Sequence, residues 1–203
     1  MRLIAEDLAG ERGGETVFSG VSFALGQGEG LIVTGANGSG KSTLLRIVAG
    51  LLPVAAGRVA LEGGGEDFPD IASACHYLGH LNAMKPALTV AENLAFWQAQ
   101  MGAAQMGVAE ALDLVDLPHT LHLPYSYLST GQKRRVSIAK LFLNARPVWI
   151  VDEPTAGLDK QSEAAFVSFL GDHLEDGGIL IAATHLPLPV KGVRGLVMGA
   201  AHG

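Results

Sequence analysis

This sequence is poor in the features that several protein classes depend on. Its 203 residues include one cysteine, Cys75, so no disulfide can form within a single chain. Only 17% of the residues are charged and 48% are hydrophobic, which excludes a disordered chain. Apolar runs such as Val148–Val151 fall far short of the ~18 residues that a transmembrane helix needs. We therefore expect about one globular domain. If this domain works at a membrane, a partner protein must attach it there.

Basic charge is also scarce, with 14 Lys and Arg against 20 Asp and Glu, for a net charge of −6. No basic stripe stands out, which argues against broad nucleic-acid binding. The N-terminal residues Met1–Asp7 reach an acidic side chain at Glu6 and contain no apolar h-region, so they do not form a signal peptide. We expect no nucleic-acid partner and no direct membrane span.

Short apolar stretches predict strands that alternate with helices, as in an α/β protein. Strands are expected at residues 2–8, 17–25, 30–34, 58–61, 148–151, 179–183 and 195–198. Helices are expected at 42–49, 90–101, 108–115, 132 to about 144, and 162–174. Thr89 and Glu92 have the spacing of a capping box and predict the start of one helix. The pattern indicates an α/β core with a helical insert at about residues 84–140.

Glycine is abundant, with 27 residues, and the cluster at 35–40 predicts phosphate binding. Gly35-Ala36-Asn37-Gly38-Ser39-Gly40-Lys41-Ser42 fits G-x-x-x-x-G-K-[ST] at every fixed position, between an expected strand and an expected helix. Backbone N–H groups and the helix N-terminus would face phosphate oxygens. Lys41 would reach the β- and γ-phosphates, and the Ser42 hydroxyl, followed by Thr43, would bind Mg²⁺. A chance glycine-rich turn is the alternative, and this context disfavours it.

Two carboxylates, Asp152 and Glu153, follow the apolar run at 148–151. A buried strand would deliver Asp152 to the Mg²⁺ shell. Glu153 would point to the other side of the backbone, where it could polarise a water for attack on the γ-phosphate. The motif alone also fits an exposed strand end, but its place downstream of the P-loop favours the catalytic interpretation.

A second anion site is suggested by Leu128-Ser129-Thr130-Gly131-Gln132, which precedes a basic segment. The Ser129 hydroxyl and the Gly131 N–H would lie at a helix N-terminus, where anions bind. An ordinary serine N-cap is the alternative, and for this segment alone it is the favoured one.

The order of these motifs resembles that of the ATP-binding cassette (ABC) ATPases. Pro154–Asp159 is similar to that family's D-loop, and His185 to its switch histidine. The resemblance implies an α/β P-loop NTPase fold with a RecA-like core, an N-terminal antiparallel β subdomain and a helical insert, as one domain over 1–203. It implies ATP and Mg²⁺ as cofactors, Glu153 and His185 as catalytic residues, and Asp152 as a metal ligand. It also implies a dimer with a second copy of the chain, in which Ser129, Gly131 and Gln132 contact the partner's ATP.

A finer resemblance rests on two segments. Tyr77-Leu78-Gly79-His80 occupies the family's Q-loop, and Leu128–Val136 has Thr130 in place of the second signature glycine. Both are similar to the ATP-binding subunits of haem exporters of c-type cytochrome maturation. This implies integral membrane partners, a peripheral location on the cytoplasmic face of the inner membrane, and haem export or handling. A non-transport ABC protein, or a small-molecule kinase or GTPase, is the competing interpretation.

Two positions depart from the family pattern. His80 stands where most members have Gln. It would offer a lone pair near Mg²⁺ and the attacking water, as a catalytic or metal-binding residue, or serve only as a spacer. No aromatic residue aligns with the adenine-stacking position, so we expect Arg12 to stack on the base, with Phe18 as the alternative. The other histidines show no metal-ligand spacing and are expected at the surface or at helix caps: His76, His119, His122, His173 and His202.

Overall fold

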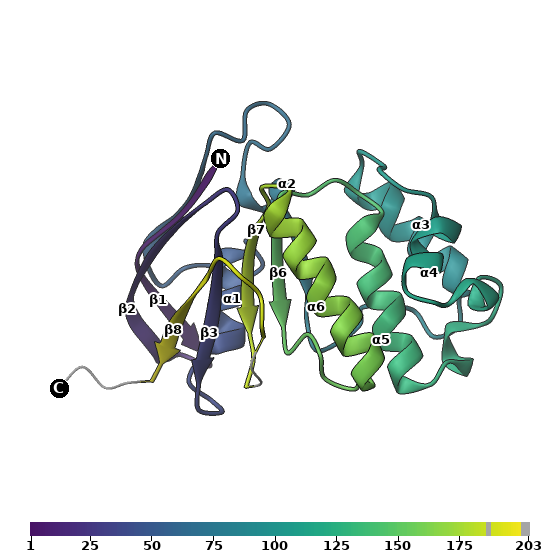
Figure 1. The fold of residues 1–203 in the computed structure, drawn as a ribbon. Helices are drawn as coiled ribbons and strands as arrows, with labels where there is room; N and C mark the ends of the chain where they lie inside the picture. Colours follow the sequence, from purple (N-terminus) through teal and green to yellow (C-terminus); the bar gives the residue numbers. More distant parts are fainter. Residues whose placement is uncertain (186–187, 200–203) are drawn as a thin grey trace. The chain divides into compact units, whose positions relative to one another are not determined.

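The computed structural model describes residues 1–185 and 188–199 and divides the chain into two compact units (Figure 1). The β-rich unit comprises Met1–Gly79, Pro147–Pro154 and the chain from Val167 onward. The helical unit comprises His80–Arg146 and Thr155–Phe166. His202 and its expected surface role lie outside the described residues.

The β-rich unit contains an antiparallel sheet of three strands in the order β2-β1-β4. Its strands are β1 (Arg2–Arg12), β2 (Glu15–Gly26) and β4 (Ala56–Glu62). Gly13 and Gly14 both have positive φ and join β1 to β2 in a two-residue turn, which suits the twist of a β-hairpin. This sheet corresponds to the N-terminal antiparallel β subdomain that the resemblance to ABC ATPases implies.

A parallel sheet of five strands forms the rest of the unit, in the order β5-β6-β7-β3-β8. Its strands are β3 (Gly30–Gly35), β5 (Cys75–Leu78), β6 (Val148–Asp152), β7 (Ile179–Ala183) and β8 (Val193–Met198). Every residue of β6 and β7 is buried, as expected for central strands of a parallel sheet. Two short helices accompany the sheets: α1 (Lys41–Val48) and α2 (Ile71–Ala74).

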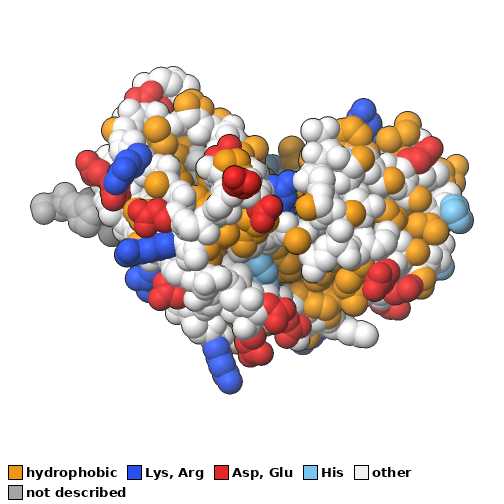
Figure 2. All heavy atoms as spheres, turned by 90° about the horizontal axis from the view of Figure 1, so that it is seen from above, with side chains coloured by type: hydrophobic (Ala, Val, Ile, Leu, Met, Phe, Trp, Pro, Cys, Tyr) orange, Lys and Arg blue, Asp and Glu red, His pale blue; other side chains and the backbone are white. Residues whose placement is uncertain are grey.

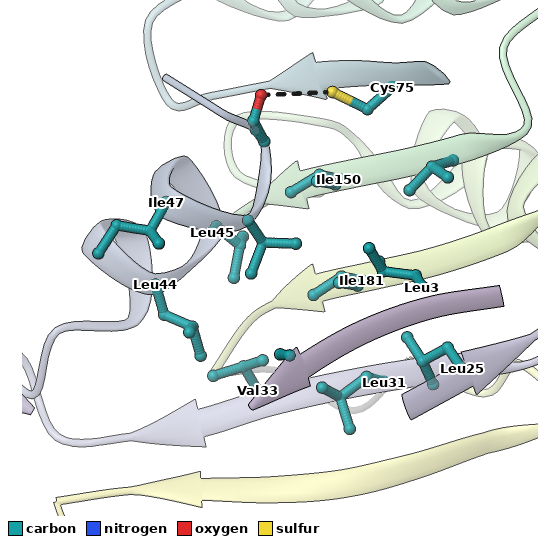
Figure 3. Close-up of a cluster of buried hydrophobic side chains, with 14 of the residues drawn as sticks. Leu3, Leu25, Leu31, Val33, Leu44, Leu45, Ile47, Cys75, Ile150 and Ile181 are labelled. Carbon is teal, nitrogen blue, oxygen red and sulfur yellow. Dashed lines mark hydrogen bonds between the residues drawn. The ribbon is translucent and has the colours of Figure 1, made fainter. Parts of the chain in front are cut away.

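One hydrophobic core joins the two sheets to α1 (Figure 3). Leu3 and Leu25 come from the small sheet and Ile150 and Ile181 from the large one, while Leu45 comes from α1. These side chains are fully buried. Because α1 directly follows β3, this core fixes the loop at residues 35–40 between a buried strand and a buried helix.

The helical unit contains α3 (Val90–Met101), α4 (Val108–Leu114) and α5 (Thr130–Ala139). α6 (Lys160–Glu175) begins in it. The predicted capping box of α3 is confirmed, because Glu92 N donates to Thr89 Oγ1 at 3.1 Å and Thr89 N donates to Glu92 Oε2 at 2.7 Å. α5 ends earlier than predicted, at Ala139, and a 3₁₀ turn follows at Lys140–Phe142. No helix among the described residues has the length and apolar character to cross a membrane.

The surface carries no concentration of basic charge on the face shown in Figure 2, where side chains of both signs are scattered. The expected surface or capping role is wrong for two histidines. His76 is fully buried in β5, and His173 of α6 stacks on Trp149 with ring centroids 4.1 Å apart. His76 is buried because it lies on a strand that the sequence patterns did not reveal.

The half-buried imidazole of His173 predicts a loss of stability in acid. Burial lowers the pKa of His173 from 6.5 to about 4, against the opposing effect of its hydrogen bond to the Ile179 carbonyl. Because the pKa is lowered in the folded state, the stabilising contribution of neutral His173 to the free energy of unfolding is complete above pH 6.5. It is lost as the pH falls from 6.5 towards 4. The free energy of unfolding should therefore drop by up to about 3 kcal/mol across that range through this residue.

Urea unfolding at pH 7.5 and pH 4.5 measures this effect. His173→Phe retains an aromatic ring against Trp149 but cannot titrate, so it should lose less stability between these pH values than the unsubstituted chain. Equal losses in the two proteins would contradict the assignment.

Candidate functional site

The predicted phosphate, metal and catalytic segments of the β-rich unit meet at one edge of the parallel sheet. Val33 of β3 and Asp152 of β6 both pair with Ala183 of β7. The carboxyl ends of these three adjacent strands therefore lie side by side. In open α/β sheets this edge is where ligands bind. The loop that follows β3 is the predicted P-loop.

Two glycines of this loop allow contacts that a side chain would block. Gly35 has φ 143°, and a Cβ atom there would overlap the Met198 carbonyl oxygen of neighbouring β8. Gly40 has φ 91°, and its Cβ would lie 2.9 Å from the Phe18 ring. The loop is thus wedged between β8 and the aromatic ring of β2, which fixes its path.

The Lys41 side chain folds back along the loop. Its Nζ donates hydrogen bonds to the Gly35 carbonyl at 2.8 Å and the Ala36 carbonyl at 3.1 Å. Lys41 is only 8% exposed, so its charge sits in a partly dehydrated position at the start of α1. An ammonium has three donors and these carbonyls take two of them, which leaves the group able to bind an anion while it braces the loop.

The loop also presents uncharged hydrogen-bond donors that suit a phosphate group. α1 begins at Lys41 with no side chain capping its N-terminal N–H groups. Ser39 Oγ is buried and has no hydrogen-bond partner among the described residues. An uncapped helix N-terminus and an unsatisfied hydroxyl beside an ammonium make a set of donors directed at one anion.

The catalytic candidates follow β6 and β7 directly. Glu153 N donates to the Ala183 carbonyl at 2.8 Å, and Thr184 N donates to the Val33 carbonyl at 3.2 Å. Glu153 has φ 46°, a left-handed conformation that costs a non-glycine residue roughly 1–2 kcal/mol. Its carboxylate Oε1 lies 3.5 Å from His185 Nε2. Asp152, one residue earlier, is 2% exposed, so the two carboxylates occupy different environments.

The predicted second anion site lies in the helical unit, at the start of α5. Ser129 is the N-cap: Gln132 N donates to its Oγ at 3.2 Å, and Ser129 N donates to Gln132 Oε1 at 2.9 Å. The ordinary N-cap interpretation therefore holds, and the hydroxyl proton remains a donor. A Cβ at Gly131 would lie 3.3 Å from the Gly157 carbonyl, so this helix start packs closely on the predicted D-loop.

Of the remaining predicted residues, Arg12 and Phe18 lie in the β-rich unit and His80 lies in the helical unit. Arg12 is exposed at the end of β1, beside the hairpin turn. Phe18 is buried in the hydrophobic core beneath Gly40, which favours a packing role over base stacking. His80 is exposed and is the first residue of the helical unit.

Sequence reasoning missed two features of these sites. The S-x-x-Q spacing of Ser129 and Gln132 is itself a capping-box signal, and it predicts that the serine oxygen accepts a hydrogen bond from the Gln132 N–H. Contacts of Tyr77 with Arg46 and Asp152 had no sequence signal, because they join residues that lie 31 and 75 positions apart in the chain.

Comparison with known proteins identifies the class. The family model described as "ABC transporter" matches residues 18–156. The chain therefore belongs to the ABC transporter family. It also matches a dimeric ATP-binding cassette, solved in a post-hydrolysis state with ADP and Pi, with a TM-score of 0.82 and 22% identity over 97% of this chain and 96% of that one. This likeness confirms the predicted fold class.

Two relatives show which members of the ABC transporter family this chain is similar to. A protein of Chelativorans sp. (strain BNC1) is 63% identical over 100% of both chains. A protein of Mesorhizobium japonicum is 65% identical over 99% of this chain and 100% of its own. Both are named cytochrome c biogenesis ATP-binding export protein CcmA.

Proposed function

We propose that this chain is the ATP-hydrolysing subunit of a bacterial inner-membrane ABC complex of cytochrome c biogenesis, where ATP hydrolysis drives haem export or haem handling. The observation that carries this proposal is the 63–65% identity, over nearly the whole chain, to proteins bearing that name. The two units together form one ABC ATPase domain, and the predicted insert at about residues 84–140 lies within the helical unit, which also includes Thr155–Phe166. The subunit binds at the cytoplasmic face of the membrane through integral membrane partners.

The loop at residues 35–43 holds the phosphates of ATP. Lys41 contributes the cation, and the uncapped N-terminus of α1 and the Ser39 hydroxyl contribute neutral donors. Arg12 at the exposed end of β1 is the proposed contact for the base. These groups bind and orient the nucleotide with its γ-phosphate towards the carboxyl ends of β6 and β7.

The proposed Mg²⁺ ligands are the Ser42 hydroxyl and the Asp152 carboxylate, with His80 as a further candidate. Oxygen donors of this kind suit Mg²⁺, which usually takes one or two carboxylates and completes its shell with phosphates and waters. Among the described residues, no group of three or more His, Cys, Asp and Glu side chains is placed to hold a metal ion. When bound, the ion neutralises charge on the β- and γ-phosphates.

Glu153 is the proposed general base. Its carboxylate accepts a proton from the attacking water, and His185, 3.5 Å away, orients the water and the γ-phosphate. His80 is proposed to offer a lone pair at the same water, by its place in the family's Q-loop. Glu153 has a left-handed backbone directly after β6, and we assign the Asp152 carboxylate to the metal and the Glu153 carboxylate to the water.

The ATP site is completed by a second copy of the chain. Ser129, Gly131 and Gln132 at the start of α5 present a hydroxyl and N–H groups to the γ-phosphate held by the partner's P-loop. Two-fold symmetry makes two such sites per dimer. Hydrolysis removes the γ-phosphate that both helix N-termini face. The dimer then opens, and this movement is passed to the membrane partner.

His80 and the segment Leu81–Pro86 form the proposed surface for the membrane partner. Leu81 is 72% exposed and Phe96 50% exposed, so apolar side chains of the helical unit are available there. The backbone of the segment is held by α3 and α5, since Trp97 Nε1 donates to the Ala83 carbonyl at 3.0 Å and Ser137 Oγ to the Asn82 carbonyl at 3.2 Å.

His185→Ala should reduce ATP hydrolysis by at least about 100-fold, a typical loss when one group aligned with the transition state is removed. Nucleotide affinity should change little, because His185 acts on the water and not on the P-loop. Steady-state turnover and fluorescent-nucleotide titration measure the two effects, with the exposed His119→Ala as control. Equal losses in turnover and affinity would indicate a structural role instead.

Expression in a bacterial strain that lacks its own counterpart tests the proposed function. The unsubstituted chain should restore c-type cytochromes, measured by haem staining, and should be isolated in detergent together with integral membrane subunits. Glu153→Gln should be isolated with the same subunits but restore no cytochrome. Recovery with ribosomes or nucleic acid, and no effect on cytochromes, would contradict the proposal.

A further inference from the structure

Tyr77 lies on β5, immediately before the segment that leads to His80. It pairs in register with Ile150 of β6, and Asp152 is two residues further along β6. Residues two apart on a strand point to the same face, so Tyr77, Ile150 and Asp152 share a face of the sheet. Ile150 packs in the core against α1, and the Tyr77 ring packs against the same cluster. Tyr77 is therefore directed at the space between α1 and the end of β6.

Two hydrogen bonds meet at the Tyr77 hydroxyl. Arg46 Nε, on α1, donates to Tyr77 Oη at 3.4 Å, and Tyr77 Oη donates to Asp152 Oδ2 at 3.5 Å. Burial raises the pKa of the Tyr77 phenol, so the hydroxyl keeps its proton at neutral pH and remains a donor. A relay of two bonds thus links the helix that begins at the P-loop to the carboxylate at the end of β6.

The backbone that follows Tyr77 packs on its ring. A Cβ atom at Gly79 would lie 2.9 Å from Tyr77 Cε1 and 3.5 Å from Tyr77 Oη. Glycine at 79 is what lets the chain pass this close, and the ring is fixed between the core and that backbone. The orientation of the hydroxyl is consequently set from three sides: by α1, by β6 and by the residue before His80.

We propose that Tyr77 is a positioning residue for the metal-binding carboxylate: its hydroxyl, held by Arg46, fixes the orientation of Asp152 towards the cation that accompanies ATP. The inference rests on the proposed nucleotide site and adds to it a residue that touches neither nucleotide nor metal. Outer-shell donors of this kind orient carboxylate ligands, and their loss weakens metal binding. Packing alone would need only the ring of Tyr77, so removal of the hydroxyl separates the two roles.

Tyr77→Phe is the test, with Mn²⁺ as the probe. Mn²⁺ is titrated into the full chain saturated with ADP, and free Mn²⁺ is measured by electron paramagnetic resonance. The dissociation constant of Mn²⁺ should rise about tenfold, at the lower end of the effect of outer-shell substitutions. ADP affinity in EDTA and the thermal unfolding midpoint should stay unchanged. Tyr127→Phe, at a side chain that is 78% exposed, is the matched control and should change neither.

Arg46→Met tests the relay itself. It should weaken Mn²⁺ binding less than Tyr77→Phe, and the double variant should be no weaker than Tyr77→Phe alone, because the arginine acts through the hydroxyl. Additive effects of the two substitutions would overturn the relay.

An Mn²⁺ affinity of Tyr77→Phe within twofold of the unsubstituted chain would overturn the positioning role. So would a parallel fall in metal-free ADP affinity and in the unfolding midpoint, since that pattern belongs to a residue that only packs. Failure of the unsubstituted chain to bind ADP in EDTA would overturn the proposed nucleotide site instead, which keeps the two failures distinct.

Discussion

Glu153→Gln should abolish ATP hydrolysis while ATP still binds. The amide preserves the shape of the side chain but cannot accept a proton from the attacking water, and loss of a general base typically costs 10²–10⁴-fold in rate, so we expect a fall of about 10³-fold. The P-loop is untouched, so ATP should remain with the protein through gel filtration.

Turnover and nucleotide content, measured on the same sample, check this expectation. Glu175→Gln, an exposed acid near the end of α6, is the matched control and should behave as the unsubstituted chain does. ADP release at the normal rate from Glu153→Gln would show that another group takes the proton. His185 would be the first candidate, because its Nε2 lies 3.5 Å from the same carboxylate.

Lys41→Ala should remove ATP binding and hydrolysis together. In the proposed site the ammonium is the cation of the P-loop, and its loss would leave the β- and γ-phosphates to neutral donors, at a cost of about 10²–10³-fold in turnover. Because Nζ also braces the Gly35 and Ala36 carbonyls, the loop should become less ordered in the substituted chain.

Isothermal titration with ATP, together with turnover, measures the effect, and Lys191→Ala at an exposed position serves as the control. Thermal unfolding without nucleotide separates the loss of a phosphate contact from a general loss of stability. Near-normal turnover of Lys41→Ala would contradict the assignment of the P-loop.

The parts of the site that the sequence predicted are those that follow from strand, loop and helix order. The P-loop lies between a buried strand and a helix, and Asp152 and Glu153 follow a run of buried residues, so their common sheet edge could be anticipated. The two N-terminal strands and the start of α3 at Thr89 were predicted from local signals as well, whereas the antiparallel pairing of the strands was implied only by the family resemblance. In these cases a few neighbouring residues determine the structure.

The features that were missed depend on contacts between distant segments. β5 has only four residues, includes His76, and shows no alternation of polar and apolar side chains that would mark it. Phe18 is buried partly because the loop passes close to its ring at Gly40. The hydrogen bond of Tyr77 to Asp152 requires the parallel register of β5 and β6, which no local pattern encodes.

In the proposed dimer, ATP is bound by the P-loop of one chain and the start of α5 of another. Multi-angle light scattering of Glu153→Gln with and without ATP tests this arrangement most directly, because we expect this variant to hold ATP without hydrolysing it. Ser129→Arg in the same background places a long cation where the N-cap hydroxyl would face the partner's phosphate, and Ser168→Arg on the exposed surface of α6 is the matched control. We expect Glu153→Gln and its Ser168→Arg form to double in mass only when ATP is added, and the Ser129→Arg form to bind ATP and stay monomeric. ATP-dependent dimers that form equally well with Ser129→Arg would contradict this shared ATP site.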